Sequence, residues 1–427
     1  MRKPLPAGGG FLLLRRLSSP SALADKLHSM PRISSKGQAM PDSPIRKLAP
    51  FAVAAKAEGR KVLHLNIGQP DIATPQVALD AVKGMDRTVI EYSPSDGFAT
   101  YREGLAGYYR SVGVDVTPEQ VIVTTGGSEA LVFAFQACLE PGDEVIIPEP
   151  FYANYNGFAT MAGVKVVPVT SKIEDGFALP PVADIAAKVT DRTRAILICN
   201  PGNPTGYVYT DAELDAIRSL VLEHDLYLFA DEVYREFCYG DQTPTSVLSL
   251  PGLDDHVVLM DSVSKRYSMC GARIGALVTR NAAVHQACMR FAMARLSPPT
   301  LAQIAGEAAL RTPASYFEEV KAAYVDRRDA LVAGLNAIPG VTVPEPGGAF
   351  YAVARLPIDS SDAFCQWMLS EFHLDGETVM MAPASGFYAT PGAGQDEVRI
   401  AYVLETAAIR RAVAIIAAGL EAYPGRR

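Results

Sequence analysis

The sequence lacks several features that would assign it to a special class of protein. None of its six cysteines forms a CxxC pair, and their spacing matches neither a zinc site nor a disulfide framework. No apolar run approaches the roughly 20 residues that a membrane-spanning helix requires. The formal net charge is −8, so the excess of Lys and Arg that nucleic-acid binding requires is also missing. We therefore expect free, mostly buried thiols in a reducing compartment, the cytoplasm, and neither a membrane nor nucleic acid as a partner.

The first thirty residues have little in common with the rest of the chain. They are basic, contain Pro, Gly and Ser, and include one acidic residue, Asp25. Their apolar run, "FLLL", is too short for the core of a secretory signal. A transit peptide, a disordered tail and sequence upstream of a genuine start at Met30 remain open, and we favour the last two. Residues 1–30 are therefore expected to be a disordered extension outside the fold.

What the sequence does contain, from about residue 120 to 280, is an alternation of β-type runs and helical patterns. The runs that read as strands are "QVIVTT", "EVIIPE", "KVVPVT", "RAILICN", "LYLFADE", "HVVLMD" and "IGALVT". Between most of them lie helical stretches such as "SEALVFAFQACLE", opened by Ser128, and "TDAELDAIRSLVLEHD", capped by Thr210 or Asp211. This alternation predicts an α/β fold with a mostly parallel central sheet sandwiched by helices.

The length of 427 residues and a change in character along the chain predict two domains. After about residue 310 the sequence becomes helix-rich, with strand-like pieces at "GGAFYAVARL" and "EVRIAYVL" and a closing helix from about Glu405. We predict a large domain over residues 76–310 and a smaller α+β domain over residues 311–427. The N-terminal segment, residues 31–75, is expected to pack with the smaller domain.

Two strand exits suggest an anion site beside a reactive amine, because ligands of such sheets bind beyond the carboxyl ends of the strands. The glycine turn in "TTGGSEAL" suits an anion, although it is also ordinary turn chemistry. In "SVSKRYSMCGARIG", Ser262, Ser264 and Arg273 could hold a phosphate. Lys265 would then lie beside it, with its amine available for a carbonyl. A surface lysine is the alternative, but it gives no reason for the surrounding serines and arginine.

Three further polar residues follow or occupy apolar strands. Asn203, in "NPGNPTG", either marks a turn or presents its amide to a site. Asp231, with Tyr234 three residues on, either caps a helix or pairs with a protonated heteroaromatic nitrogen. Arg399, in "VRIAYVL", needs an anion, which is either a ligand carboxylate or an internal acid. Each motif has an ordinary explanation alone, but their combination describes a site for pyridoxal phosphate.

The same motifs resemble those of the class I/II aminotransferases, which are fold type I pyridoxal phosphate enzymes, and among these the aspartate aminotransferase group. The resemblance runs from about Ser43 to the C-terminus. It is carried, in the expected order, by "LNIGQPD", "YSPSDGFATYR", "TTGGSEAL", "NPGNPTG", "ADEVY", "SVSKRYSMCGARIG" and "VRIAY".

The resemblance implies a role for each residue at the cofactor ring. Lys265 would form the Schiff base and then carry a proton between the substrate α-carbon and the cofactor. Asp231 would keep the pyridine nitrogen protonated. Tyr234 and Asn203 would bond the ring oxygen, and Tyr152 would stack on the ring.

The resemblance also implies how the phosphate and the substrate are held. The phosphate ligands would be Gly127, Ser128, the backbone of Glu129, Ser262, Ser264 and Arg273. Tyr92 would cross to the phosphate of a second subunit, which implies a homodimer with shared active sites. Arg399 would clamp the substrate α-carboxylate, helped by Asn203 and the backbone of Gly68.

The implied reaction is transfer of the amino group of an L-amino acid to 2-oxoglutarate. An aspartate-like donor is favoured and an aromatic one stays open, because Ser128 stands where aspartate-specific relatives often have a basic residue, and Gln69 where the group often has Glu. We hypothesise that Arg295 reads a dicarboxylic side chain in a neighbouring subunit. Its ordinary alternative is a helix-end arginine that bonds carbonyls.

Two other functions stay open on the same scaffold. A pyridoxal phosphate-dependent C–S β-lyase needs the same Lys265 and Asp231, so the motifs do not separate it from a transaminase. A non-catalytic, aminotransferase-like regulatory domain is disfavoured, because the acidic balance does not suit DNA.

Overall fold

The computed structural model describes residues 31–427, so the predicted extension over residues 1–30 lies outside the described residues. The chain divides into two units, Met1–Met40 and Pro41–Arg427. In the first unit, the described residues form the short helix α2 (Ser35–Ala39). All further description concerns residues 41–427.

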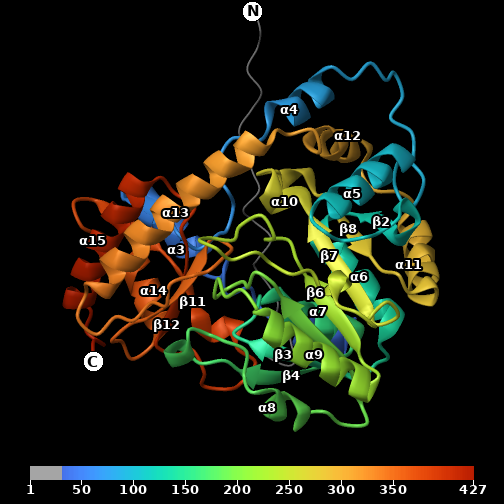
Figure 1. Cartoon of the computed structure of the whole chain (residues 1–427). Helices are drawn as coiled ribbons and strands as arrows, with labels where there is room; N and C mark the ends of the chain where they lie inside the picture. The colour runs from blue at the N-terminus through green and yellow to red at the C-terminus, as the bar shows by residue number, and fades with distance from the viewer. Residues whose placement is uncertain (1–30) are drawn as a thin grey trace, which may run out of the picture. The chain divides into compact units, whose positions relative to one another are not determined.

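A seven-stranded sheet forms the centre of this unit, in the order β2-β8-β7-β6-β5-β3-β4 (Figure 1). The strands are β2 (Val121–Thr124), β3 (Glu144–Glu149), β4 (Lys165–Thr170), β5 (Thr193–Cys199), β6 (Tyr227–Asp231), β7 (Val257–Ser262) and β8 (Gly275–Val278). Strand β8 is antiparallel to both of its neighbours, and the other pairs are parallel. Each strand corresponds to one of the predicted runs, so the mostly parallel sheet is confirmed.

Helices cover both faces of this sheet, because neighbouring residues of a strand point to opposite faces. In β5, for example, Ile196 and Ile198 belong to one buried cluster, whereas Ala195 and Leu197 belong to another. The first cluster includes residues of α4 (Gln76–Lys83), α5 (Ala99–Ser111), α8 (Val182–Ala186), α9 (Asp211–His224) and α12 (Thr300–Ala309). The second includes residues of α6 (Gly126–Cys138), α7 (Asn154–Ala162) and α11 (Ala282–Arg295).

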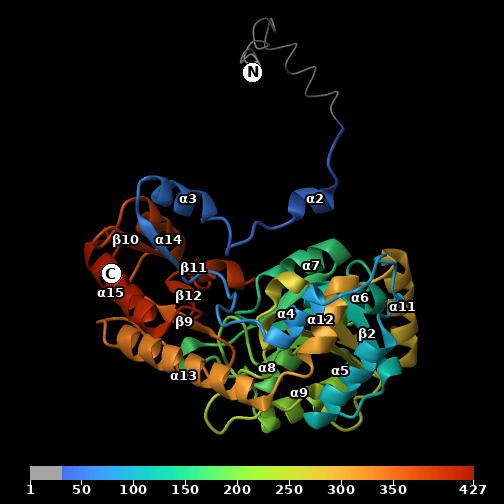
Figure 2. The ribbon, with the colours of Figure 1, turned by 90° about the horizontal axis from the view of Figure 1, so that it is seen from above.

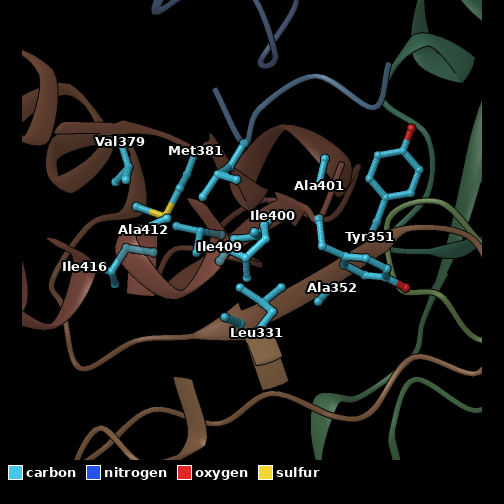
Figure 3. Close-up of a cluster of buried hydrophobic side chains, with 14 of the residues drawn as sticks. Leu331, Tyr351, Ala352, Val379, Met381, Ile400, Ala401, Ile409, Ala412 and Ile416 are labelled. Atoms are coloured by element: carbon cyan, nitrogen blue, oxygen red, sulfur yellow. The ribbon is translucent and has the colours of Figure 1, made fainter. Parts of the chain in front are cut away.

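A second core is built from the two ends of the described chain. Strand β1 (Lys61–His64) pairs in parallel with β10 (Glu377–Met380), and β11 (Ala382–Pro383), β12 (Glu397–Ala401) and β9 (Tyr351–Arg355) form an antiparallel sheet. The accompanying helices are α3 (Ala49–Ala57), α13 (Ala314–Asn336), α14 (Ser361–Ser370) and α15 (Thr406–Ala422). Figure 2 shows α13 as the long helix that leads from α12 into this core. Figure 3 shows Leu331, Ile400 and Ile409 from three of these elements close together.

These contacts agree with a second core that includes part of the segment before residue 75, although the exact domain bounds stay a prediction.

Thr210 caps α9, and its side chain and that of Glu213 form the reciprocal bonds of a capping box. Helix α6 differs from the expectation, because it begins at Gly126 rather than at Ser128. None of the helices in the described part of the chain is long and apolar enough to cross a membrane.

Candidate active site

A cavity of about 620 Å³ lies at the ends of strands β5, β6 and β7, where the sheet topology predicts ligand binding. Most of the predicted site residues line it. These are Gly68, Gly127, Ser128, Tyr152, Asn203, Asp231, Tyr234, Ser262, Ser264, Lys265, Arg273 and Arg399. The fold thus gathers residues from widely separated segments around one space.

Lys265 lies in the short helix α10 (Val263–Arg266), directly after β7. Its Nζ donates to the carbonyl oxygen of Gly68 at 2.6 Å and lies 3.7 Å from the Sγ of Cys270. No carboxylate among residues 31–427 forms an ion pair with this amine. An amine in this position is available to a carbonyl group that enters the cavity.

Asp231 is the last residue of β6, and its carboxylate is buried. Burial raises its pKa from 3.8 to about 6, although hydrogen bonds from Tyr155 and Val233 act in the opposite direction. The Tyr155 hydroxyl donates to Oδ2 at 2.8 Å, and the Val233 N–H lies 3.4 Å from Oδ1. The helix-cap alternative does not apply, because a turn rather than a helix follows β6. A buried carboxylate without an ion pair suits a cationic ligand group.

Arg399, in β12, is a buried cation of the same cavity, with 1% of its surface exposed. Its Nη1 donates to the Asn203 Oδ1 at 3.2 Å, and its Nη2 donates to the carbonyl oxygen of Asn66. The guanidinium carbon lies 4.6 Å from the centroid of the Tyr351 ring and 4.8 Å from that of Phe387. These contacts fix the plane of the guanidinium group.

The alternative that Arg399 pairs with an acid of the protein itself does not hold among the described residues. None of their carboxylates pairs with it, and its Nε has no hydrogen-bond partner among them. Burial accordingly lowers its pKa. Because a buried guanidinium needs an anion, a carboxylate on a ligand is the partner that this position suits.

Tyr234 and Tyr351 form a hydroxyl pair beside Arg399. Their oxygens are 2.9 Å apart, and Asn203 Nδ2 lies 3.4 Å from the Tyr234 hydroxyl. Burial raises the pKa of Tyr234 well above its ordinary value. Tyr351 also packs on Gly68, where any Cβ would lie 1.7 Å from the Tyr351 hydroxyl oxygen. Glycine is therefore required there for the two segments to meet.

The opposite end of the cavity is built for an anion. Gly126, at the first turn of α6, has a φ of +75°, and a Cβ there would lie 2.5 Å from Nη2 of Arg273. The Ser262 hydroxyl donates to that of Ser264 at 2.7 Å, and both residues line the cavity. A helix N-terminus, an arginine and two hydroxyls together suit a group of phosphate size.

Three predicted residues do not line the cavity of this chain. The carboxylate of Glu129 accepts from Nη1 of Arg295 at 2.6 Å, and Arg295 also donates to the carbonyl oxygen of Ser95 at 2.8 Å. Arg295 therefore bonds a backbone carbonyl oxygen, as the alternative interpretation predicted, and it also pairs with the Glu129 carboxylate. Tyr92 is 78% exposed. The roles expected of Tyr92 and Arg295 in a neighbouring subunit stay predictions.

Several lining residues were not predicted. Tyr351, Cys270, Arg46 and Asn154 all line the cavity, and Tyr155 supports Asp231 from behind it. Cys270 lies within a quoted motif, but Tyr351 and Arg46 come from segments whose local sequence has no signal beyond a strand or a turn. None of the described His, Cys, Asp and Glu side chains form a group that could hold a metal ion.

Comparison with known proteins agrees with this geometry. Residues 60–416 match the family described as "Aminotransferase class I and II". The aspartate aminotransferase of Bacillus subtilis is 32% identical over 392 residues, which cover 90% of this chain and 97% of that relative. The aspartate/prephenate aminotransferase of Thermus thermophilus is 32% identical over 386 residues, which cover 89% of this chain and 97% of that relative.

Solved structures extend the likeness to the fold. The aspartate aminotransferase from Thermus thermophilus with maleate has a TM-score of 0.83 and 31% identity, over 91% of this chain and 100% of that one. The predicted fold type I architecture is therefore confirmed. From the family match, these relatives and this fold, the chain belongs to the class I and II aminotransferases and is a transaminase.

Proposed function

We propose that the protein uses pyridoxal 5′-phosphate to transfer the amino group of an L-amino acid to 2-oxoglutarate. An aspartate-like donor is favoured and an aromatic donor is the second choice, in keeping with the relatives named for aspartate and prephenate. The observation that carries the proposal is one cavity that contains a reactive amine, a buried carboxylate and a buried guanidinium, neither of the last two with an ion-pair partner in the described chain.

The lining residues fit this cofactor. The buried Asp231 carboxylate suits a protonated ring nitrogen, since that cation would lower its raised pKa. The N-terminus of α6, Arg273 and the hydroxyls of Ser262 and Ser264 suit the phosphate. Gly127, Ser128 and the backbone of Glu129 would complete this end, and Tyr152 would cover the ring.

When bound, pyridoxal phosphate supplies an aldehyde that accepts the amine and a protonated ring that withdraws electrons from the substrate α-carbon. Lys265 would hold the cofactor through its amine, and the same Nζ, once a substrate amine has replaced it, would carry a proton between the substrate α-carbon and the cofactor. Tyr234 and Asn203 would donate hydrogen bonds to the ring oxygen. Asp231, in its ionised form, would keep the ring nitrogen protonated.

Arg399 orients the substrate by binding its α-carboxylate through two parallel hydrogen bonds. Asn203, already bonded to Nη1, and the backbone of Gly68 would assist it. We further propose a homodimer in which Tyr92 reaches the phosphate of the second site. The high exposure of Tyr92 in the single chain, 78%, supports this assignment.

The test is a set of half-reactions with the purified holoenzyme and one amino acid at a time, followed by the visible spectrum of the cofactor. A donor should convert the aldehyde form to the amine form, and 2-oxoglutarate should restore it. Release of pyruvate and ammonia in place of that conversion would contradict the proposal and favour C–S β-elimination. The mass of the assembly in solution checks the dimer, and the affinity for pyridoxal phosphate of wild type and Tyr92→Phe checks the phosphate contact.

A further inference from the structure

The wall of the cavity includes a segment far in sequence from the strand exits. Ser43, Ile45 and Arg46 line the same space as Lys265 and Arg399. They belong to a turn before α3, in which the N–H groups of Arg46 and Lys47 point to the carbonyl oxygen of Ser43. The segment thus carries one cation, Arg46, into the lining of the site.

The backbone of this segment is held in place. Asn66 Nδ2 donates to the carbonyl oxygen of Ile45 at 2.9 Å, and the Asn66 carbonyl oxygen accepts from Arg399. Pro44 packs so closely on Gly386 that a Cβ at position 386 would lie 2.3 Å from it. One residue, Asn66, therefore links the position of Arg46 to that of the proposed carboxylate clamp.

The Arg46 side chain has no internal partner among residues 31–427. None of their hydrogen bonds, ion pairs or ring contacts includes its guanidinium, and the residue as a whole is exposed. The adjacent Lys47, in contrast, pairs with Asp362. Arginines without a protein partner are common on exposed surfaces. Arg46, however, lines a cavity in which Asp231 is the single carboxylate among the described lining residues.

The charges of the cavity leave Arg46 without a counterpart once the proposed ligands are placed. In the proposed complex, Asp231 pairs with the ring nitrogen and Lys265 binds the aldehyde. Arg273 binds the phosphate, and Arg399 binds the α-carboxylate. A substrate with a single carboxylate would leave the fifth charge, on Arg46, unmatched. A dicarboxylic substrate supplies the missing anion.

The position of Arg46 agrees with this assignment. Burial raises the pKa of Tyr152 to about 12, and the charges of Arg399 and Arg46 both act on this phenol in the opposite direction. Both guanidinium groups therefore lie near the Tyr152 hydroxyl, and all three residues line the same cavity. A ligand held by Arg399 would thus share one space with Arg46.

We propose that Arg46 is a specificity-determining residue that binds the distal carboxylate of a dicarboxylic amino acid, or of its 2-oxo acid, while Arg399 holds the α-carboxylate. This inference rests on the proposed function and assigns its substrate class. It places the distal-carboxylate ligand in the N-terminal segment of the same chain, whereas Arg295 of this chain is already bonded to Glu129.

The experiment compares Arg46→Gln with the wild type in single half-reactions of the holoenzyme. Aspartate and glutamate are the dicarboxylic donors, and alanine and phenylalanine are the neutral ones. Arg410→Gln removes the same charge from an exposed position on α15 that does not line the cavity. The second-order rate constant for the dicarboxylic donors should fall about 10- to 100-fold in Arg46→Gln, and that for the neutral donors by less than about twofold.

Arg46→Lys should give an intermediate loss, because it keeps the charge and loses the planar fork. Equal losses for all four donors, or no loss, would overturn the inference while leaving the proposed function intact. A selective loss in Arg295→Ala instead of Arg46→Gln would also overturn it. Failure of every donor with the wild-type enzyme would refute the proposed function itself.

Discussion

The replacement Asp231→Asn should stabilise the cofactor-free protein at neutral and alkaline pH. Folding raises the pKa of this carboxyl from 3.8 to about 6, because the ionised form is buried without an ion pair. Such an acid costs folding free energy wherever it must be ionised, by about 3 kcal/mol at pH 8. Asparagine avoids that cost and can still bond both neighbours, by accepting from the Val233 N–H and donating to the Tyr155 hydroxyl oxygen.

The effect of Asp231→Asn on the free energy of unfolding should depend on pH. Below the unfolded pKa the carboxyl is protonated in both states, so the cost is absent; it grows as the pH rises from about 4 to about 6 and then stays constant. Urea unfolding of cofactor-free wild type and Asp231→Asn should therefore differ by roughly 2–3 kcal/mol at pH 8 and by only about 1 kcal/mol at pH 4.5. Added pyridoxal phosphate should stabilise the wild type more than the variant, because only the carboxylate pairs with the ring nitrogen.

Asp261 is the matched control, since it is also buried and lies on the neighbouring strand β7. Burial alone would raise its pKa, but Arg266 and Arg235 outweigh this and lower it. Removing this partnered charge in Asp261→Asn should destabilise the protein by about 3–5 kcal/mol. If Asp231→Asn were as destabilising as Asp261→Asn at pH 8, or if its effect did not change with pH, the reasoning about Asp231 would be refuted.

Three further predictions concern the same cavity. Lys265→Ala should abolish the borohydride-trappable adduct with pyridoxal phosphate while the protein keeps its far-UV circular dichroism spectrum. An adduct at full yield would exclude Lys265 as the residue that forms the Schiff base. Arg399→Lys should weaken all amino donors about 10- to 100-fold alike, measured as Kd in half-reactions, since it removes the bidentate clamp; a loss confined to dicarboxylic donors would contradict this role. Tyr351→Phe removes one hydroxyl of the pair with Tyr234 and should shift the pH at which the bound cofactor changes colour; an unchanged spectral titration would mean that the pair does not act on the ring.

The central sheet and its exits could be predicted from the sequence because both follow from local patterns. Apolar runs separated by helices fix a parallel sheet, and parallel strands place their carboxyl ends on one edge. Asp231 and Ser262 are the last residues of β6 and β7, and Asn203 lies in the turn that follows β5, so strand assignment alone brought them together. The alternative for Asp231 was decided by the turn that follows β6, and that for Arg399 by its lack of an acid partner among the described residues, which is a property of three-dimensional packing.

The residues that the sequence did not reveal reach the cavity through long-range contacts. Tyr351 enters because β9 pairs with β12, which sets it beside Arg399. Arg46 enters because Asn66 holds the preceding turn. Neither position has a spacing or a neighbour that marks it, since a tyrosine at a strand start and an arginine in a turn are common. Such residues are found only once the fold has brought distant segments together.

The pairing of β1 with β10 constrains the order in which the molecule can assemble during synthesis. Lys61 and Glu377, which face each other in this pair and are joined by a salt bridge, are 316 residues apart in the chain. At about 5–20 residues per second, a ribosome takes roughly 15 to 60 seconds to cover that distance. The β1 strand must therefore wait, with Val62 and Leu63 lacking their final neighbours, while the central sheet emerges. Chaperone contacts with the nascent chain are expected to concentrate on this early strand until the last helix has left the exit tunnel.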